Sequence, residues 1–169
     1  FFNNENFKLG NASGLYLAIK DYKPLVQNEK SVFPSGTSQL YSNTGYLLLG
    51  AIIESVSGEN YFEYVQKHIF DVAHMPNSGF FEMDDPVPNL AIGFGKYQNN
   101  NSIKWKNNLF TNVFKGSPAG GGFSTAHEMK NFANALMNGK LLNETYTKLF
   151  LSGKVKRPEQ ASGYFKKTI

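Results

Sequence analysis

Cysteine is absent from this 169-residue sequence, which excludes disulfide bridges, thiolate metal sites and a cysteine nucleophile together. Arginine is nearly absent as well, since Arg157 is the only one. The 17 basic residues outnumber the 13 acidic ones, and the net charge is +4. This small excess of lysine does not indicate a nucleic-acid partner. The longest apolar run, from Tyr46 to Ile53, is far shorter than the ~20 residues that span a bilayer, so no integral membrane segment is expected.

Metal and nucleotide motifs are missing too. His68, His74 and His127 are the only histidines and form no His-Glu-x-x-His pattern, so we expect no metal site and no cofactor. The run Gly120–Gly122 lacks the Gly-Lys-Ser/Thr ending of a phosphate-binding loop. Either a tight turn or a loop that faces a substrate would explain it. No Gly-x-Ser-x-Gly elbow occurs, so a Ser-His-Asp triad is not supported.

The length favours a single domain, residues 1–169. Residues 44–56 are apolar on nearly every side, which predicts a buried helix with Asn43 as its cap and Gly58 at its end. Capping residues and helical spacing predict three more helices: from Asn60 to Phe70, between Thr125 and Gly139, and between Asn143 and Gly153. Alternating residues on both sides of an asparagine turn predict a β-hairpin within residues 89–106.

Tyr41-Ser42-Asn43 is the strongest candidate for chemistry, but only because of its surroundings. Asparagine is abundant, so a Tyr-x-Asn arises by chance, and Tyr97-Gln98-Asn99 is a second copy. The first copy alone follows Phe33-Pro34-Ser35-Gly36-Thr37 and leads into the apolar helix that Ser57-Gly58 closes. The second copy lies in the asparagine turn without such a frame.

This frame resembles the serine β-lactamase and penicillin-binding-protein-like superfamily, in particular its class C and esterase-like branch, where a Pro-Gly-Thr stretch precedes Tyr-x-Asn. The resemblance continues through residues 61–70, through the stretch Ser117–Thr125 and through Gly139-Lys140-Leu141-Leu142. It covers roughly residues 33 to 153, and the order of the matching segments gives it specificity.

Two elements of that family are missing. No serine in the sequence is followed by lysine at the third position, so the Ser-x-x-Lys that carries the nucleophile is absent. The nearest match to the late Lys/His-x-Gly is Lys8-Leu9-Gly10, which precedes the tyrosine instead of following it. The resemblance and the start without Met lead us to expect an internal fragment of a larger hydrolase, its helical subdomain. The expected fold class is therefore mainly α with a small β-hairpin. Apolar surface should remain exposed where the α/β half would dock, and a homodimer could cover it.

The resemblance also implies roles for individual residues. Tyr41 would be the proton shuttle and Asn43 would orient the substrate or the nucleophile's lysine, while Gly120 and Gly121 would line the edge of the pocket. The whole protein would hydrolyse a β-lactam, a D-amino-acid peptide of the cell wall or an ester through an acyl-enzyme, outside the cytoplasm. The isolated chain would show no turnover, because a base without its nucleophile has nothing to activate.

Two alternatives stay open at this point. Tyr41 could be an aromatic anchor and Asn43 a helix cap, with no part in catalysis. The chain could also be a non-catalytic module that binds peptidoglycan or a protein through its aromatic residues and mild positive charge. A Ser-x-x-Lys upstream in the same reading frame would favour the enzyme.

Overall fold

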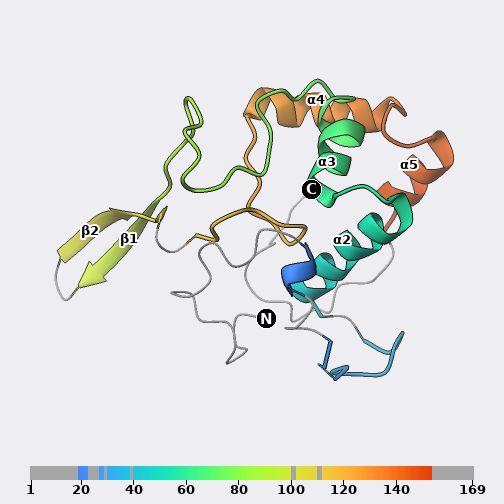
Figure 1. Ribbon diagram of the computed structural model, residues 1–169, viewed down its shortest axis with the longest axis horizontal. Helices are drawn as coiled ribbons and strands as arrows, with labels where there is room; N and C mark the ends of the chain where they lie inside the picture. The colour runs from blue at the N-terminus through green and yellow to red at the C-terminus, as the bar shows by residue number, and fades with distance from the viewer. Residues whose placement is uncertain are drawn as a thin grey trace.

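The computed structural model describes residues 19–22, 27–28, 30–38, 40–99, 102–109 and 112–153. Helices and one antiparallel pair of strands are the regular structure of these residues (Figure 1). The hairpin extends from one side of the molecule, and the α-helices lie together on the other (Figure 1). The expected fold class, mainly α with a small β-hairpin, is confirmed.

The elements follow the predicted order. They are η2 (Ile19–Tyr22), α2 (Asn43–Ser57), α3 (Tyr61–Val65), the π-helical turn η3 (Gln66–Phe70), β1 (Phe94–Asn99), β2 (Ser102–Asn107), α4 (Ala126–Met137) and α5 (Glu144–Leu151). The helix predicted from Asn60 to Phe70 is thus divided into α3 and a wider turn, where the amide of Asp71 donates to the carbonyl of Gln66. Asn60, Thr125 and Asn143 cap their helices as predicted.

The predicted cap of the first long helix is wrong by one residue. Ser42 is the N-cap of α2: its backbone is extended (φ −144°, ψ 114°) and its Oγ accepts a hydrogen bond from the amide of Gly45 at 3.1 Å. Asn43 is already the first helical residue. Gly58 ends the helix in the left-handed conformation (φ 72°), as the sequence predicts.

The core joins the end of η3 to α4. Ala73, Met75 and Ala135 are buried, and three half-buried side chains pack against them: Phe70, Phe132 and Leu141. A second buried contact lies under α2, where Leu47 and Ile19 are both less than 5% exposed. These two small clusters hold the helical side of the molecule together.

The expectation that the helix at residues 44–56 is buried on all sides is wrong. Leu47 and Gly50 are its only buried residues. Ile53 is half-buried, and the other large apolar side chains of the helix are exposed: Tyr46, Leu48, Leu49, Ile52 and Val56. The described part of the chain therefore supplies packing partners for one side of α2 only, and the other side is left as an exposed apolar face. No helix among the described residues is long and apolar enough to cross a membrane.

Candidate functional site

The structure brings Tyr41 and Asn43 into direct contact at the start of α2. The phenol Oη of Tyr41 donates a hydrogen bond to Asn43 Oδ1 at 2.8 Å. The centre of the Tyr41 ring also lies 5.9 Å from that of Tyr46, which is near the start of α2. The extended conformation at Ser42 turns the two flanking side chains toward each other, so the middle residue of the motif shapes the pair.

The structure also bears on the structural alternative for each residue. Tyr41 is 72% exposed, which is not the environment of a buried aromatic anchor. Asn43 does not cap α2, because Ser42 does, and the Asn43 side chain accepts from the phenol instead. An exposed phenol bonded to an amide is available to a molecule that binds at the start of α2.

Gly120 and Gly121 lie in a glycine-rich loop (residues 116–122) and differ in their surroundings. A reciprocal pair of backbone hydrogen bonds between Ser117 and Gly120, at 2.8 and 2.9 Å, closes the turn. A Cβ added at Gly120 would meet no atom within 4 Å, whereas one at Gly121 would lie 3.1 Å from Cα of Gly116. Both have positive φ, 131° and 87°, which favours glycine. Gly120 therefore borders open space, and Gly121 serves the packing of the turn.

The glycine-rich loop packs directly on α2. A Cβ built on Gly50 would lie 2.3 Å from Cγ of Pro118, so only glycine allows the loop to approach the helix this closely. Gly50 is seven residues after Asn43, about 10 Å along the helix axis. Asn43 and the contact of Pro118 with Gly50 are thus about two turns apart on α2.

A buried carboxylate lies a few residues after this loop and was not predicted as a site residue. Glu128, only 3% exposed, accepts hydrogen bonds from the amide and the Nδ2 of Asn77 (2.9 and 2.7 Å) and from the hydroxyl of Ser78 (2.6 Å). The only hydrogen of the Ser78 hydroxyl is used in the hydrogen bond to the carboxylate, so in the 2.7 Å contact between the two hydroxyls Ser124 donates and Ser78 accepts. Burial raises the pKa of Glu128, but the hydrogen bonds from Ser78 and Asn77 outweigh it and hold the pKa below its ordinary value.

This Glu128 network (Glu128, Asn77, Ser78 and Ser124) joins the segment after the glycine-rich loop to residues 77 and 78. Next to it, Gly79 and Phe123 exchange backbone hydrogen bonds of 3.0 and 2.8 Å. The sequence signal for Glu128 was the Thr125-x-x-Glu128 capping pattern. The amide of Glu128 does donate to Thr125 Oγ1 at 3.2 Å, but its carboxylate turns to residues 77 and 78 instead of returning to the cap.

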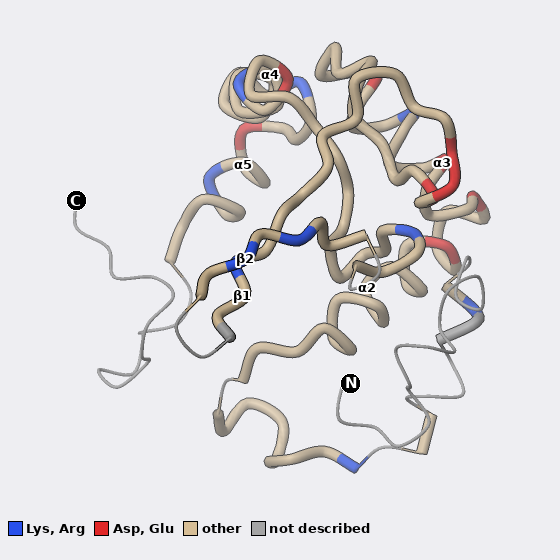
Figure 2. Tube along the Cα trace, turned by 90° about the vertical axis from the view of Figure 1, so that its left-hand side faces the viewer, with Lys and Arg blue, Asp and Glu red and all other residues tan. Residues whose placement is uncertain are grey.

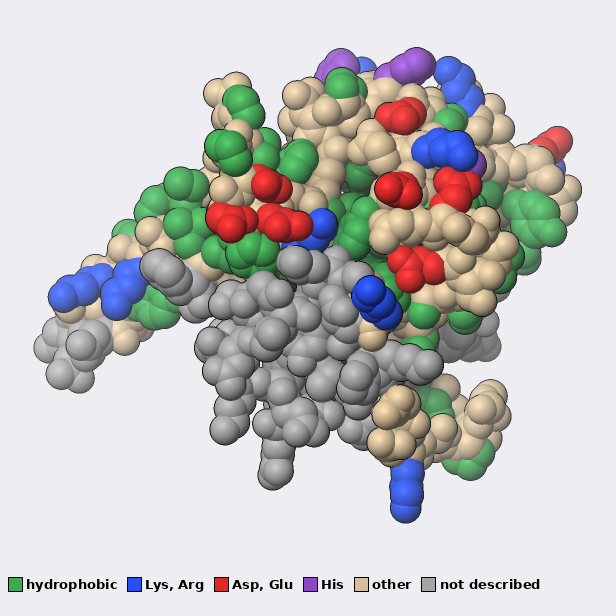
Figure 3. Space-filling view, in the orientation of Figure 1, with side chains coloured by type: hydrophobic (Ala, Val, Ile, Leu, Met, Phe, Trp, Pro, Cys, Tyr) green, Lys and Arg blue, Asp and Glu red, His purple; other side chains and the backbone are tan. Residues whose placement is uncertain are grey.

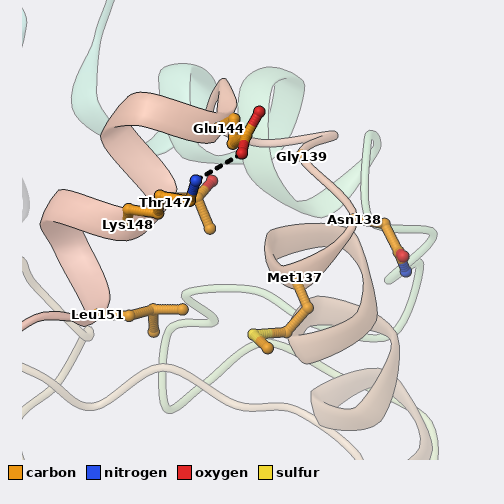
Figure 4. A pocket seen from close by; sticks show the side chains of 7 residues that line it. All are labelled: Met137, Asn138, Gly139, Glu144, Thr147, Lys148 and Leu151. Atoms are coloured by element: carbon orange, nitrogen blue, oxygen red, sulfur yellow. Dashed lines mark hydrogen bonds and ion pairs between the residues drawn. The ribbon is translucent and has the colours of Figure 1, made fainter.

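A cavity of about 490 Å³ lies elsewhere, between the end of α4 and α5 (Figure 4). Met137 and Leu151 supply apolar walls, and the ion pair between Glu144 and Lys148 (2.6 Å) lies at its edge. None of the predicted site residues lines it. We therefore place the candidate site at the start of α2 and the adjoining loop, where the chemistry-bearing side chains lie.

Comparison with known proteins identifies the family. The model of the Beta-lactamase family matches residues 10–166. The chain belongs to the beta-lactamase family. A crystal structure of a penicillin-binding protein from Bacillus halodurans is similar to it, with a TM-score of 0.79 and 37% identity over 85% of this chain and 44% of that one. The human serine beta-lactamase-like protein LACTB, mitochondrial, is 32% identical over 68% of this chain and 20% of its own length.

The fold of this beta-lactamase family member also recurs in more distant proteins. The octameric penicillin-binding protein homologue from Pyrococcus abyssi has a TM-score of 0.67 at 23% identity, over 85% of this chain and 32% of that chain. The resemblance inferred from the ordered motifs is confirmed. This beta-lactamase family chain spans 19% to 28% of the length of the curated relatives it matches.

Proposed function

We propose that this chain is the part of a beta-lactamase-like serine hydrolase that carries the proton-transfer pair, Tyr41 and Asn43, while the serine nucleophile lies in another part of the whole protein. The observation that carries the proposal is the hydrogen bond from Tyr41 Oη to Asn43 Oδ1 on an exposed surface, with helix capping left to Ser42. Membership of the beta-lactamase family supports the reaction class.

The proposed step is a proton transfer at Tyr41 Oη. As phenolate, Tyr41 would take the proton of the serine hydroxyl while the serine oxygen bonds to the substrate carbonyl carbon. The proton then passes to the leaving amine or alkoxide as its bond to that carbon breaks, which leaves an acyl-enzyme that water hydrolyses. Asn43 suits both states of the phenol: Oδ1 accepts from the neutral hydroxyl, and the Nδ2 amide can donate to the phenolate after a turn about χ2.

The glycine-rich loop would form one edge of the substrate site. Open space beside Gly120 leaves room for a leaving group, and Gly121 keeps the turn in the required shape. The proposed substrates are small: a β-lactam, a D-amino-acid peptide or an ester. We further propose that the whole protein acts outside the cytoplasm. The exposed apolar face of α2 would be covered by the rest of that protein or by a second copy.

The isolated chain provides the first test. The purified 169 residues should not hydrolyse a chromogenic cephalosporin or a p-nitrophenyl ester, because the chain contains no Ser-x-x-Lys. Steady turnover that Tyr41→Phe abolishes would contradict this separation of base and nucleophile.

The longer protein encoded by the same reading frame provides the second test. If it contains an upstream Ser-x-x-Lys, Tyr41→Phe should lower its kcat by about 100-fold or more, the usual contribution of a general base. Tyr97→Phe, in the second Tyr-x-Asn copy, is the matched control and should leave kcat unchanged. Equal activity of the two variants would refute the role of Tyr41. A reading frame without any Ser-x-x-Lys would favour the non-catalytic binding module.

A further inference from the structure

The β-hairpin presents large side chains to solvent on nearly all its positions. Every residue of β2 is exposed, and in β1 Phe94, Lys96, Tyr97 and Gln98 are exposed as well. The hairpin extends from one side of the molecule in Figure 1, and Figure 3 shows basic side chains beside hydrophobic ones along it. A two-stranded hairpin gains little stability from such exposed residues, so their chemistry calls for another explanation.

The register separates the two faces of the hairpin. Residues that pair across the strands share a face, and neighbours along a strand alternate. The pairs Phe94↔Asn107, Lys96↔Trp105 and Gln98↔Ile103 therefore lie on one face. We call Phe94, Ile103 and Trp105 the apolar face; they are 61%, 53% and 66% exposed, and Lys96, Gln98 and Asn107 lie among them on the same side.

The hairpin is also strongly cationic. It carries Lys96, Lys104 and Lys106 and no acidic residue, and none occurs anywhere between Asp85 and Glu128. Figure 2 shows the basic positions on the strands and the acidic ones on other parts of the described chain. Lys106 Nζ lies 5.7 Å above the ring of Tyr97 on the face opposite Trp105. A surface with these charges attracts an anionic partner.

We propose that the hairpin docks on an anionic lipid surface, with the apolar face inserted at the interface, Lys96 on that same face bound to a headgroup, and Lys104 and Lys106 on the opposite face adding electrostatic attraction. Tryptophan and phenylalanine next to lysine is the composition that favours the boundary between headgroups and acyl chains. The long stem of Lys96 lets its ammonium group reach a phosphate while the rings beside it go deeper. A soluble polyanion would engage the lysines but would leave Phe94, Ile103 and Trp105 in water, so the bilayer accounts for both features.

Trp105 is the only tryptophan among the 169 residues, so its fluorescence, excited at a wavelength that the nine tyrosines do not absorb, reports on the hairpin alone. The full chain is mixed with vesicles of phosphatidylcholine and phosphatidylglycerol, or of phosphatidylcholine alone. Emission should shift to shorter wavelength and become sensitive to brominated lipid with the anionic vesicles only. The shift should weaken at about 0.15 M salt, where charges further than ~8 Å apart are screened.

Variants separate the charge from the apolar contacts. Replacing Lys96, Lys104 and Lys106 by Gln should weaken vesicle binding on the order of 100-fold. The same charge change at exposed lysines elsewhere, Lys30, Lys130 and Lys140, is the matched control and should have a small effect. Phe94→Ser together with Ile103→Ser should weaken binding about 10-fold or more while leaving all charges in place.

Four outcomes would overturn the proposal. The first is an unshifted Trp105 emission with anionic vesicles, and the second is an equal loss of vesicle binding from the two sets of three lysine substitutions. The third is an emission shift that rises with protein concentration in the absence of lipid, which would indicate pairing with a second copy. The fourth is competition by soluble polyphosphate with Trp105 still in water, which would indicate a polyanion site.

Discussion

Gly50→Ala tests the contact that joins the glycine-rich loop to α2. The added Cβ would lie 2.3 Å from Cγ and 3.0 Å from Cβ of Pro118, and 3.6 Å from Cδ1 of Ile19. The proline ring cannot rotate away as a flexible side chain would, so the loop backbone must move. Overpacking of this kind costs about 1–3 kcal/mol.

Gly45→Ala is the matched control in the same helix. Its Cβ would lie 3.6 Å from Cβ of Ser42, an ordinary contact. Both variants gain about 1 kcal/mol from replacing a helical glycine, so this gain cancels when they are compared. We expect Gly50→Ala to be about 1–3 kcal/mol less stable than Gly45→Ala, measured as free energies of unfolding in urea. Equal stability of the two variants would refute the close approach of Pro118 to α2.

Two further predictions concern stability. Ser42→Ala should lower the free energy of unfolding by about 1 kcal/mol because it removes the N-cap of α2, whereas Asn43→Ala should leave that cap intact; urea titration of both variants is the measurement. Glu128→Gln should be less stable than the parent chain at neutral pH. Burial raises the pKa of the Glu128 carboxyl, but the hydrogen bonds from Ser78 and Asn77 lower it by more. The pKa therefore lies below its ordinary value of 4.5. The stabilisation by the ionised form is therefore complete above about pH 4.5 and is lost as the pH falls through the lowered folded-state pKa. Parent and variant should converge in acid, and a difference that is constant with pH would contradict the assignment.

Local signals predicted the helices well. Asn60, Thr125 and Asn143 are caps because a side-chain oxygen can reach an amide two or three residues later, which depends only on nearby sequence. The one cap that was misplaced, Asn43 for Ser42, came from two adjacent residues that are both good caps. Local sequence does not decide between such neighbours, because the choice depends on where the chain enters the helix.

Contacts between residues far apart in the sequence could not be predicted from local sequence patterns. The carboxylate of Glu128 bonds to residues 50 and 51 positions away, and a capping-box pattern predicts a local partner instead. The burial of α2 was overestimated because composition shows that a helix is apolar but not which of its sides finds a neighbour. For the candidate site, the motif indicated Tyr41 and Asn43, but only the fold shows that the two side chains bond to each other.

The backbone hydrogen bonds between Gly79 and Phe123 also separate residues 80–122, which include the hairpin, from the α-helices. Together with the antiparallel bridge between Glu82 and Lys115, these bonds hold the two ends of this long segment side by side, as a short stem. The entropy of closing a loop grows only slowly with its length, so lengthening or exchanging what lies beyond the stem costs little. The segment can therefore diverge, or be transplanted by design, while α2, α4 and α5 keep their places.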